Sequence, residues 1–344
     1  MPTTYISSSA VSQIVNSSNS LYILQTGSIV RTSTAVTFDA FGGRATIDGL
    51  IASDAATIEF ETGSFDNTLT IGSTGRVVSM AGSSAAIVMG GDSNKVVNHG
   101  EISGSHVVEM SGDHSSFSNF GLVSSSFGLD AIIMSGAFSE LNNRGVISEL
   151  QGGSAISLQN EAQIITNSGE IHSIGTGIKS AGAIDADFAK IINTGLISAG
   201  VAIDISSGLF VSVVNTGTLV GIDGTAAIFA GIGTDFHNSG VIIGDVRFDE
   251  NGGLLKNAGE VQGDVKLDQT GGIYKGSGDG WVSGTIFGGS SADVIFGASH
   301  ADSISAGGGF DNLKGRDGDD TIGGGGGNDT LRGNDGDDEI DGGN

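Results

Sequence analysis

GRDGDDTIG, residues 315–323, is one of six consecutive nine-residue units; the others are GGSSADVIF (288–296), GASHADSIS (297–305), AGGGFDNLK (306–314), GGGGNDTLR (324–332) and GNDGDDEID (333–341). Each unit has an aspartate at its sixth place, and these are Asp293, Asp302, Asp311, Asp320, Asp329 and Asp338. Two places later comes an aliphatic residue each time, at Ile295, Ile304, Leu313, Ile322, Leu331 and Ile340. A flexible acidic linker gives no reason for aliphatic residues to stay in step with aspartates, so the period indicates folded structure.

The two halves of the unit have separate physical tasks. A glycine-rich half such as Gly324–Gly327 can turn with positive φ and expose backbone carbonyls, and the aspartate adds a carboxylate oxygen, the ligand type that Ca²⁺ prefers. The other half is a short strand in which only the aliphatic residue, such as Ile322, points inward. Stacked units therefore form a thin aliphatic core that needs metal to hold it. The period predicts a calcium-binding parallel β-roll.

These units resemble the RTX (hemolysin-type) calcium-binding nonapeptide repeat. The resemblance implies that successive turns lie on alternate edges, with each ion between turns two units apart. Asp302, Asp320 and Asp338 then share one edge, and Asp293, Asp311 and Asp329 share the other. It also implies oxygens, mostly backbone carbonyls, from the third and fifth places: Ser290, Ala292, Ser299, Ala301, Gly308, Phe310, Asp317, Asp319, Gly326, Asn328, Asp335 and Asp337. About four Ca²⁺ ions follow from three turns on each edge.

Two units depart from this pattern. The fourth place holds Ser291 in the first unit and His300 in the second, where the family has glycine. We therefore expect Asp320 and Asp338 to lie in the best-formed sites.

Composition excludes several classes of partner and site. The net charge of the chain is −25, and residues 288–344 contribute to it with 12 acidic and 3 basic residues. Nucleic acid and anionic membrane surfaces are thus not expected partners. Cysteine is absent, so no disulfide or thiolate metal site can form. No apolar run is long enough for a membrane span.

The sequence also bears on localisation. Met1–Tyr5 has neither the basic start nor the apolar stretch of a signal peptide. Proteins that resemble this one in their nonapeptides leave Gram-negative cells by type I secretion, through a C-terminal signal beyond the repeats. The sequence stops at Asn344, partway through a seventh unit, so we expect the natural protein to continue. The resemblance implies an extracellular or cell-surface location.

The longer, N-terminal part of the chain is repetitive too. A motif Asn-x-Gly-x-aliphatic begins at Asn98, Asn119, Asn143, Asn167, Asn193, Asn215, Asn238 and Asn257. Weaker copies centre on Gly27, Gly49, Gly75 and Gly280, and the glycines follow one another at steps of 19 to 26 residues. Further Val and Ile patches lie within each interval, which makes three short strands per step. Stacked asparagine amides can bond along the axis, and a corner asparagine can adopt a left-handed backbone.

The predicted fold is all-β: a right-handed, three-sided parallel β-helix of about 12 coils that continues into the C-terminal RTX β-roll. An antiparallel sandwich or barrel explains alternating strands and turns, but not the recurrent corner. From Gly240 the coils shorten, which predicts that the helix narrows before the roll. The corner motifs are similar to those of bacterial autotransporter and adhesin solenoids. We expect an N-terminal cap or exchangeable strand at 1–20, the β-helix at 21–287, and the roll at 288–344.

Two classes of function fit this architecture. Some alginate epimerases join a β-helix to RTX modules, but an epimerase or lyase needs long inserted loops and basic, aromatic-lined grooves. The chain has one Trp, three Tyr and nearly constant coil lengths, so we predict no enzymatic activity and no catalytic residues. A secreted, calcium-dependent surface protein is the favoured hypothesis: a surface-layer, filament or matrix component that associates with itself head-to-tail or laterally. The alternative is a monomeric RTX adhesin that binds a cell-surface glycan.

Overall fold

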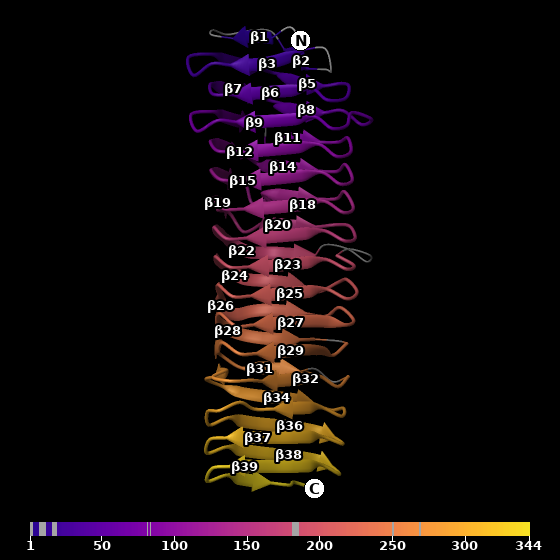
Figure 1. Ribbon diagram of the computed structural model, residues 1–344, viewed down its shortest axis with the longest axis vertical. Helices are drawn as coiled ribbons and strands as arrows, with labels where there is room; N and C mark the ends of the chain where they lie inside the picture. Colours follow the sequence, from indigo (N-terminus) through magenta and orange to yellow (C-terminus); the bar gives the residue numbers. More distant parts are fainter. Residues whose placement is uncertain are drawn as a thin grey trace. The chain divides into compact units, whose positions relative to one another are not determined.

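The computed structural model describes residues 3–6, 12–15, 19–80, 82, 84–180, 186–249, 251–267 and 270–344. All regular elements in these ranges are β-strands. The same ranges contain no helix that is long and apolar enough to cross a membrane. The chain divides into two compact units, unit 1 at residues 1–179 and unit 2 at residues 180–344. The absence of helices and the stacking within each unit confirm the predicted all-β solenoid (Figure 1).

Unit 1 has three parallel faces, named here A, B and C in chain order. Face A contains β1 (Thr3–Ile6), β3 (Ser20–Ile23), β6 (Arg44–Ile47), β9 (Thr68–Ile71), β12 (Lys95–Asn98), β15 (Ser116–Asn119), β18 (Glu140–Asn143) and β21 (Ile164–Asn167). Face B contains β4 (Ser28–Arg31), β7 (Leu50–Ser53), β10 (Arg76–Ser79), β13 (Glu101–Gly104), β16 (Leu122–Ser125), β19 (Val146–Glu149) and β22 (Glu170–Ser180). Face C contains β2 (Gln13–Val15), β5 (Val36–Phe38), β8 (Ile58–Phe60), β11 (Ala85–Met89), β14 (His106–Met110), β17 (Ile132–Met134) and β20 (Ser154–Leu158).

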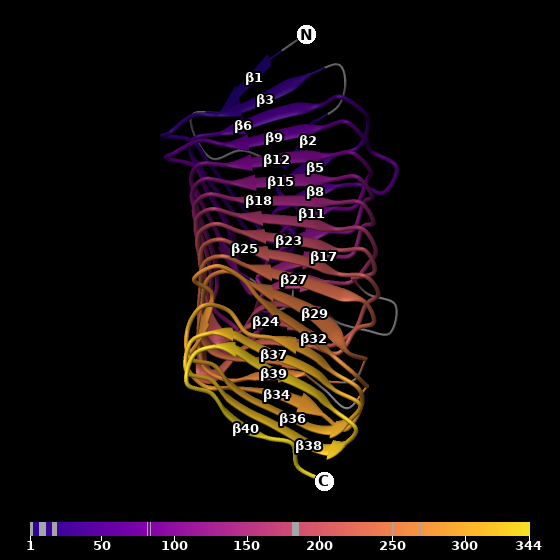
Figure 2. The same ribbon diagram turned by 60° about the horizontal axis from the view of Figure 1, so that its bottom comes forward.

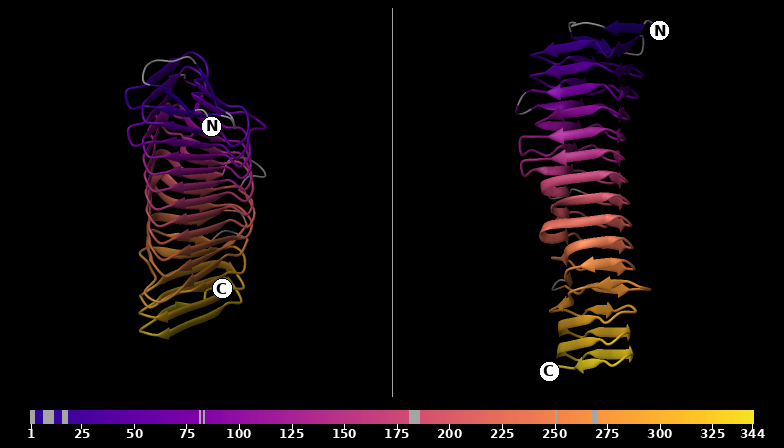
Figure 3. Two further views of the ribbon diagram at one scale, coloured as in Figure 1. Left: turned by 45° about the horizontal axis from the view of Figure 1, so that its top comes forward. Right: turned by 90° about the vertical axis from the view of Figure 1, so that its left-hand side faces the viewer.

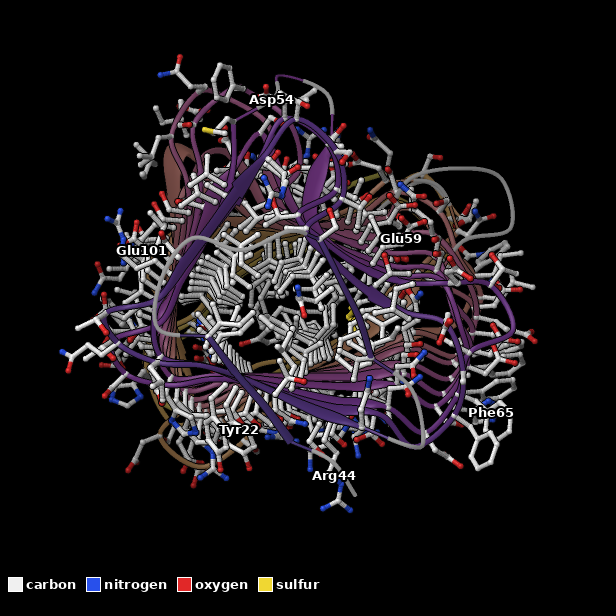
Figure 4. The ribbon with its side chains drawn as sticks, turned by 90° about the horizontal axis from the view of Figure 1, so that it is seen from above. Tyr22, Arg44, Asp54, Glu59, Phe65 and Glu101 are labelled. Atoms are coloured by element: carbon white, nitrogen blue, oxygen red, sulfur yellow. The ribbon has the colours of Figure 1, made fainter. Side chains whose placement is uncertain are left out.

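The coil of unit 1 is right-handed. In the view from the N-terminal end, Arg44 of face A is followed clockwise by Asp54 after face B, Glu59 on face C and Phe65 at the next corner (Figure 4). The chain recedes from the viewer as it turns, and this defines the right hand. The predicted hand and the three sides are thus confirmed for this unit.

Alternation along each strand separates core from surface. In β18, Leu141 and Asn143 are buried while Glu140 is exposed, and neighbouring strands pair in register so that like positions stack. The interior in Figure 4 is filled by stacked side chains, and the labelled Tyr22, Glu101 and Arg44 lie on the outside. Stacking includes aromatic pairs such as Phe38 and Phe60, whose ring centroids are 4.3 Å apart.

The corner asparagines form buried amide ladders. In unit 1, each Nδ2 donates to the Oδ1 of the next coil at 2.8 Å, along Asn98, Asn119, Asn143 and Asn167. In unit 2, the same 2.8 Å bonds join Asn193, Asn215, Asn238 and Asn257, and Asn257 Nδ2 donates to the Tyr274 hydroxyl at 3.3 Å. An amide carries both a donor and an acceptor, so a column of identical side chains satisfies itself. The predicted axial bonding is confirmed.

The prediction that these asparagines have a left-handed backbone is wrong. None of the ladder asparagines has positive φ. The described residues of unit 1 other than glycine that have positive φ lie at the corner between faces C and A, where Asp66, Ser93, His114, Phe138 and Ala162 have φ of 53° to 56°. The asparagine itself ends a strand, with extended backbone, and its side chain bonds the turn instead. Asn98 Oδ1, for example, accepts the Gly100 amide at 3.0 Å.

The glycine that follows each asparagine is required by close stacking rather than by φ. A Cβ added at Gly145 would overlap the carbonyl oxygen of Gly121, and one at Gly121 would overlap that of Gly100. The same relation recurs in unit 2, where a Cβ at Gly240 would overlap the Gly217 carbonyl. Only a residue without a side chain lets successive turns approach this closely.

Unit 2 changes from three faces to two. Face A contains β23 (Lys190–Asn193), β25 (Ser212–Asn215), β27 (Thr234–Asn238), β29 (Gly253–Asn257), β32 (Ile273–Gly276), β35 (Val294–Phe296), β37 (Asn312–Asp317) and β39 (Thr330–Asp335). Three long strands run from face B into face C: β24 (Leu196–Ile205), β26 (Thr218–Phe229) and β28 (Val241–Phe248). They are followed by β30 (Glu260–Gln262) and β33 (Trp281–Val282) on face B, and by β31 (Val265–Leu267), β34 (Thr285–Gly289), β36 (Ser303–Gly309), β38 (Thr321–Gly327) and β40 (Glu339–Asp341) on face C.

The narrowing occurs where face B ends. Strand β30 pairs with the first part of β28 and with β33, whereas β31 pairs with the last part of β28 and with β34. Within the described residues of unit 2, no strand follows β33 on face B. Strands β34, β36, β38 and β40 pair along face C, and β35, β37 and β39 pair along face A. The remaining two-sided stack is the roll, visible in yellow in Figures 2 and 3. This confirms the narrowing predicted from Gly240 onward.

Residues 1–20 lie partly outside the described ranges. Of the described part, Thr3–Ile6 pairs in parallel with β3, and Gln13–Val15 pairs with β5. These two strands belong to faces A and C of unit 1. The division of the chain at residues 20 and 287 stays a prediction.

Replacing Asn143 by alanine should destabilise unit 1. The change removes the acceptor of the Asn119 amide and the donor to Asn167, both buried, and the donor to the partly buried Glu170 carbonyl. Each unsatisfied buried group costs about 1 to 3 kcal/mol, so we expect a total loss of several kcal/mol in denaturant unfolding. Asn142→Ala on the same strand is the control, since Asn142 is only half-buried and should change stability little. Equal effects of the two variants would contradict the ladder's role.

Candidate metal centre

The roll has a thin aliphatic core, as the period predicts. Ile295 and Leu313 on face A and Ile304 and Ile322 on face C are at most 2 % exposed. Leu331 is half-buried, and Ile340 is 46 % exposed on the last strand of the roll. Each stacked unit thus adds a single inward aliphatic side chain, and the turns at the edges must supply the remaining stability.

The aspartates form the two predicted columns. Along one edge, Asp311 Oδ1 accepts the Asp293 amide at 2.8 Å and Asp329 Oδ1 accepts the Asp311 amide at 2.9 Å. Along the other, Asp320 Oδ1 accepts the Asp302 amide at 2.8 Å, and Asp338 Oδ1 accepts the Asp320 amide at 3.1 Å. Every such bond spans 18 residues, so the units that meet are two apart, as the resemblance implies.

In four of these aspartates, one carboxylate oxygen is left without a donor. The second oxygens Asp302 Oδ1, Asp311 Oδ2, Asp320 Oδ2 and Asp329 Oδ2 are buried and have no hydrogen-bond partner. Burial raises the pKa of Asp302 to about 6, and a nearby Asp320 carboxylate adds to the rise. Burial also raises the pKa of Asp311 and of Asp320. Buried oxygens of this kind fit a cation, which would supply the missing charge compensation.

Backbone carbonyls converge on the same space. A Cβ added at Gly324 would lie 2.7 Å from Asp329 Oδ2 and 2.8 Å from the Gly342 carbonyl oxygen. Equivalent overlaps join Asp302 with the Gly315 carbonyl at Gly297, and Asp320 with the Gly333 carbonyl at Gly315. First-place glycine therefore leaves an oxygen-lined cradle, and the donor set is the one Ca²⁺ prefers.

The sequence analysis did not include the carbonyl oxygens of the first-place residues among the candidate ligands. The signal that could have indicated them is the small residue that opens every unit, which is glycine in five units and Ala306 in the third. A side chain at this place would fill the cradle, so its absence marks where oxygens meet.

The later turns have left-handed backbone at their second and fourth places. In the last four units the fourth-place residues, Gly309, Gly318, Gly327 and Gly336, have φ of 111° to 147°. Neither Ser291 nor His300 has positive φ, so the first two turns have a different backbone path. The structure thus agrees with the sequence that these turns depart from the pattern, although Asp293 and Asp302 are as buried as Asp311 and Asp320.

The third- and fifth-place residues lie on the outer side of the turns. Ser299 and Gly308 are half-buried, and the rest are exposed, namely Ser290, Ala292, Ala301, Phe310, Asp317, Asp319, Gly326, Asn328, Asp335 and Asp337. The side chain of Asp319 accepts the Asp337 amide at 2.8 Å. Their role as ligands stays a prediction, as does that of the aspartates.

A site of this type depends on backbone oxygens. Within the described ranges, no three His, Cys, Asp or Glu side chains gather around a common metal position. Two carboxylates from turns two units apart, completed by carbonyls, are therefore what the roll offers to each ion.

Unit 2 carries a hollow where its last solenoid coils meet the roll. It has a volume of about 550 Å³ and is lined by Glu260, Asp279, Trp281 and His300. Glu260 and Trp281 are register neighbours on β30 and β33, where face B ends. Elsewhere the histidines make surface contacts: His99 stacks on Phe120, and His172 pairs with Glu170.

In chelator, acidification should stabilise the roll. The folded pKa of Asp302, about 6, lies above its unfolded value of 3.8, so its contribution to stability is full below pH 3.8 and is lost as the pH rises through 6. A shift of two units corresponds to roughly 3 kcal/mol. Thermal melts followed by circular dichroism should thus show a higher midpoint near pH 5 than near pH 7. Asp302→Asn should weaken this dependence, and a chelated wild type that loses stability on acidification would refute it.

Comparison with known proteins agrees with this geometry. Residues 280–313 and 314–344 match the family model of the RTX calcium-binding nonapeptide repeat (4 copies). No curated protein and no solved structure matches the chain. The matched residues contain both aspartate columns, their buried unpartnered oxygens and the first-place carbonyls. The C-terminal segment of this chain therefore belongs to the RTX calcium-binding repeats, carried on a parallel β-solenoid.

Proposed function

We propose that this protein is a secreted, calcium-dependent structural protein of the bacterial cell surface, which self-assembles through its β-solenoid into a layer, filament or matrix. The observation that carries the calcium dependence is the set of buried carboxylate oxygens without a donor in the roll. Asp302, Asp320, Asp338 and Asp293, Asp311, Asp329 would hold about four Ca²⁺ ions, together with carbonyls of the turns.

Calcium dependence couples folding to location. Where calcium is scarce, the buried carboxylates repel one another and the small aliphatic core offsets little of that cost. At the millimolar calcium of an extracellular medium, binding free energy becomes folding free energy. This coupling supports type I secretion from a Gram-negative cell as an unfolded chain, followed by folding outside.

Self-assembly is supported by surfaces left open in each unit. Exposed aromatic pairs lie at the corner between faces C and A, with Phe41 on Phe65 in unit 1 and Phe188 on Phe210 in unit 2. Repeated surface features of this kind suit repetitive contacts between copies.

Several observations favour a non-enzymatic role. The connections between strands are short in both units, as far as they are described, so no long loop stands over a face. Among the described residues, the lining of the hollow beside Trp281 has two carboxylates and a histidine, but neither a lysine nor an arginine to hold a uronate carboxylate. A lining that is acidic and lacks such bases suits neither polysaccharide epimerisation nor lysis of a polyanion.

A monomeric adhesin is the second candidate, and the same hollow favours it. Trp281 is the only tryptophan of the chain, and it is 36 % exposed. A partly exposed indole flanked by Glu260 and Asp279 could stack on a sugar ring while the carboxylates accept its hydroxyls. A cell-surface glycan is the partner that this chemistry suits.

Calcium should fold the roll in the full chain. We expect circular dichroism to show a gain of β-structure when Ca²⁺ is added to chelated protein, because the buried carboxylates then gain charge compensation. Magnesium should not replace calcium, since it loses its water reluctantly and demands a smaller octahedral site. Identical spectra in calcium and in chelator would contradict the proposal.

Two matched variants test which turns of the roll form the better calcium sites. Asp320 Oδ1 and Asp293 Oδ1 each accept one backbone amide, from Asp302 and from Gly272, so their replacement by alanine costs similar contacts in chelator. In calcium, Asp320→Ala should weaken folding more than Asp293→Ala, because Gly318 gives its turn the left-handed fourth place that Ser291 lacks. The reverse order in a calcium titration would assign the better sites to the first turns.

Assembly should depend on calcium. At a net charge of −25, copies of this chain repel one another. Bound calcium reduces the negative charge of the acidic roll. Electron microscopy in millimolar Ca²⁺ should show ordered polymers that dissolve in chelator and are lost when residues 1–20 are deleted. A monodisperse monomer at high protein and calcium concentration would refute self-assembly and leave the adhesin.

A further inference from the structure

Face A of unit 1 carries a hollow whose chemistry differs from that of the acidic chain around it. The hollow has a volume of about 500 Å³ and lies over strands β3, β6, β9 and β12. Its polar lining consists of one phenol, two cations and three hydroxyls, namely Tyr22, Arg44, Lys95, Thr46, Thr68 and Thr70. Sites for small ligands typically have volumes of about 300 to 1,000 Å³, so the hollow has a suitable size.

The parallel register gathers these residues from four successive coils. Arg44 pairs with Thr68, and Thr68 pairs with Lys95, so the two cations lie in one column with a hydroxyl between them. The neighbouring outward column begins at Tyr22 and continues through two threonines. Buried residues alternate with these positions along each strand, so both columns face outward. Figure 4 shows Tyr22 and Arg44 on the same outer side of the coil.

The difference in side-chain length shapes the hollow. Tyr22, Arg44 and Lys95 carry long side chains, whereas the positions between them hold short, half-buried threonines. The Tyr22 ring stacks on Tyr5 with the ring centroids 5.4 Å apart, and it is still 38 % exposed. The phenol ring is therefore held in place by a neighbour and is open to a ligand.

The two cations of the hollow have no internal counter-charge. Arg44 and Lys95 are exposed, and within the described ranges neither forms an ion pair; the ion pairs of unit 1 with a lysine or arginine involve Arg76 and Lys179 instead. Among the described residues, no carboxylate lines the hollow. The net charge of −25 opposes an anion only weakly here, because charges more than about 10 Å away are screened at physiological salt.

The spacing of the cations indicates an extended anionic ligand. Arg44 and Lys95 are two strands apart, which places their backbones about 9.5 Å from each other. One small anion is too short to lie beside both columns' cations at full contact, whereas a linear chain of acidic sugars carries its charges at intervals of this order. The hydroxyl of Thr68 lies between the cations and can donate to or accept from a sugar hydroxyl.

We propose that this hollow binds an acidic glycan, in which carboxylate or sulfate groups pair with Arg44 and Lys95 while one sugar ring packs on Tyr22. Guanidinium and ammonium groups are the side chains that hold such anions, and a partly exposed phenol offers an apolar face with a polar tip. The chemistry is the opposite of that of the hollow beside Trp281, whose carboxylates suit uncharged sugar hydroxyls.

A second copy of the chain is the competing occupant, because the roll is acidic. The roll would offer carboxylates to the two cations, but the hydroxyl floor and the exposed phenol match the hydroxyls and the ring faces of a sugar more closely. None of the lining residues belongs to the roll, so the proposal is independent of the calcium dependence proposed above.

Three single variants of the full chain test the site. Arg44→Gln and Lys95→Gln each remove one cation from the hollow and keep an exposed polar side chain of similar length. Arg76→Gln is the matched control, because it changes the net charge equally but removes a cation of face B that Glu101 already engages at 3.0 Å. Circular dichroism of each variant verifies that the fold is retained.

The measurement is isothermal titration calorimetry in calcium, with hexagalacturonate as the acidic probe, cellohexaose as a neutral probe of equal length, and sodium sulfate. We expect hexagalacturonate to bind more tightly than the other two. Arg44→Gln and Lys95→Gln should each weaken its binding about ten-fold, since each removes hydrogen bonds to a charged group, and Arg76→Gln should leave it unchanged. Tyr22→Leu should weaken binding of the hexamer but not of sulfate.

Four results would overturn the proposal. Binding of hexagalacturonate that survives both hollow variants would place it elsewhere on the chain. Equal binding of cellohexaose would show that the cations recognise nothing, and equal affinity for sulfate would reduce the hollow to a simple anion site. Self-association that is lost in Arg44→Gln and Lys95→Gln without any sugar, measured by sedimentation, would assign the hollow to the acidic roll of a second copy.

Discussion

The structure depends on stacking identical polar side chains on successive coils. Where the residue is asparagine, each amide donates to the next and accepts from the one before, so the column is neutral and complete. Where it is aspartate, both oxygens are acceptors, and backbone amides satisfy only one of them. The same geometry is therefore self-sufficient in the solenoid coils and in need of a cation in the roll.

Glycine sets how closely these columns can form. Beside the asparagines, it allows the carbonyl of the preceding coil to lie where a Cβ would be, as at Gly145 and Gly240. In the roll, the same lack of a side chain opens the oxygen-lined cradle at Gly324. One residue type thus permits tight packing in one part and a metal position in the other.

At the change from the solenoid coils to the roll, several residues depart from the repeat. Face B ends at β33, and the fourth places of the first two roll turns hold Ser291 and His300, where the later turns hold glycine. The solenoid coils and the calcium-binding repeats meet at this point.

Periodicity in the sequence determined the solenoid class, the coil corners, the two aspartate columns and the calcium preference, because residues at a fixed interval must stack in any parallel coil. It could not determine which backbone atoms meet: the left-handed corner lies at Asp66 and Phe138 rather than at the asparagines, and first-place carbonyls such as that of Gly315 complete the cradles. It also gave no sign that Arg316 reaches Gly276. These features depend on φ angles and on contacts across turns, which only the assembled coils decide.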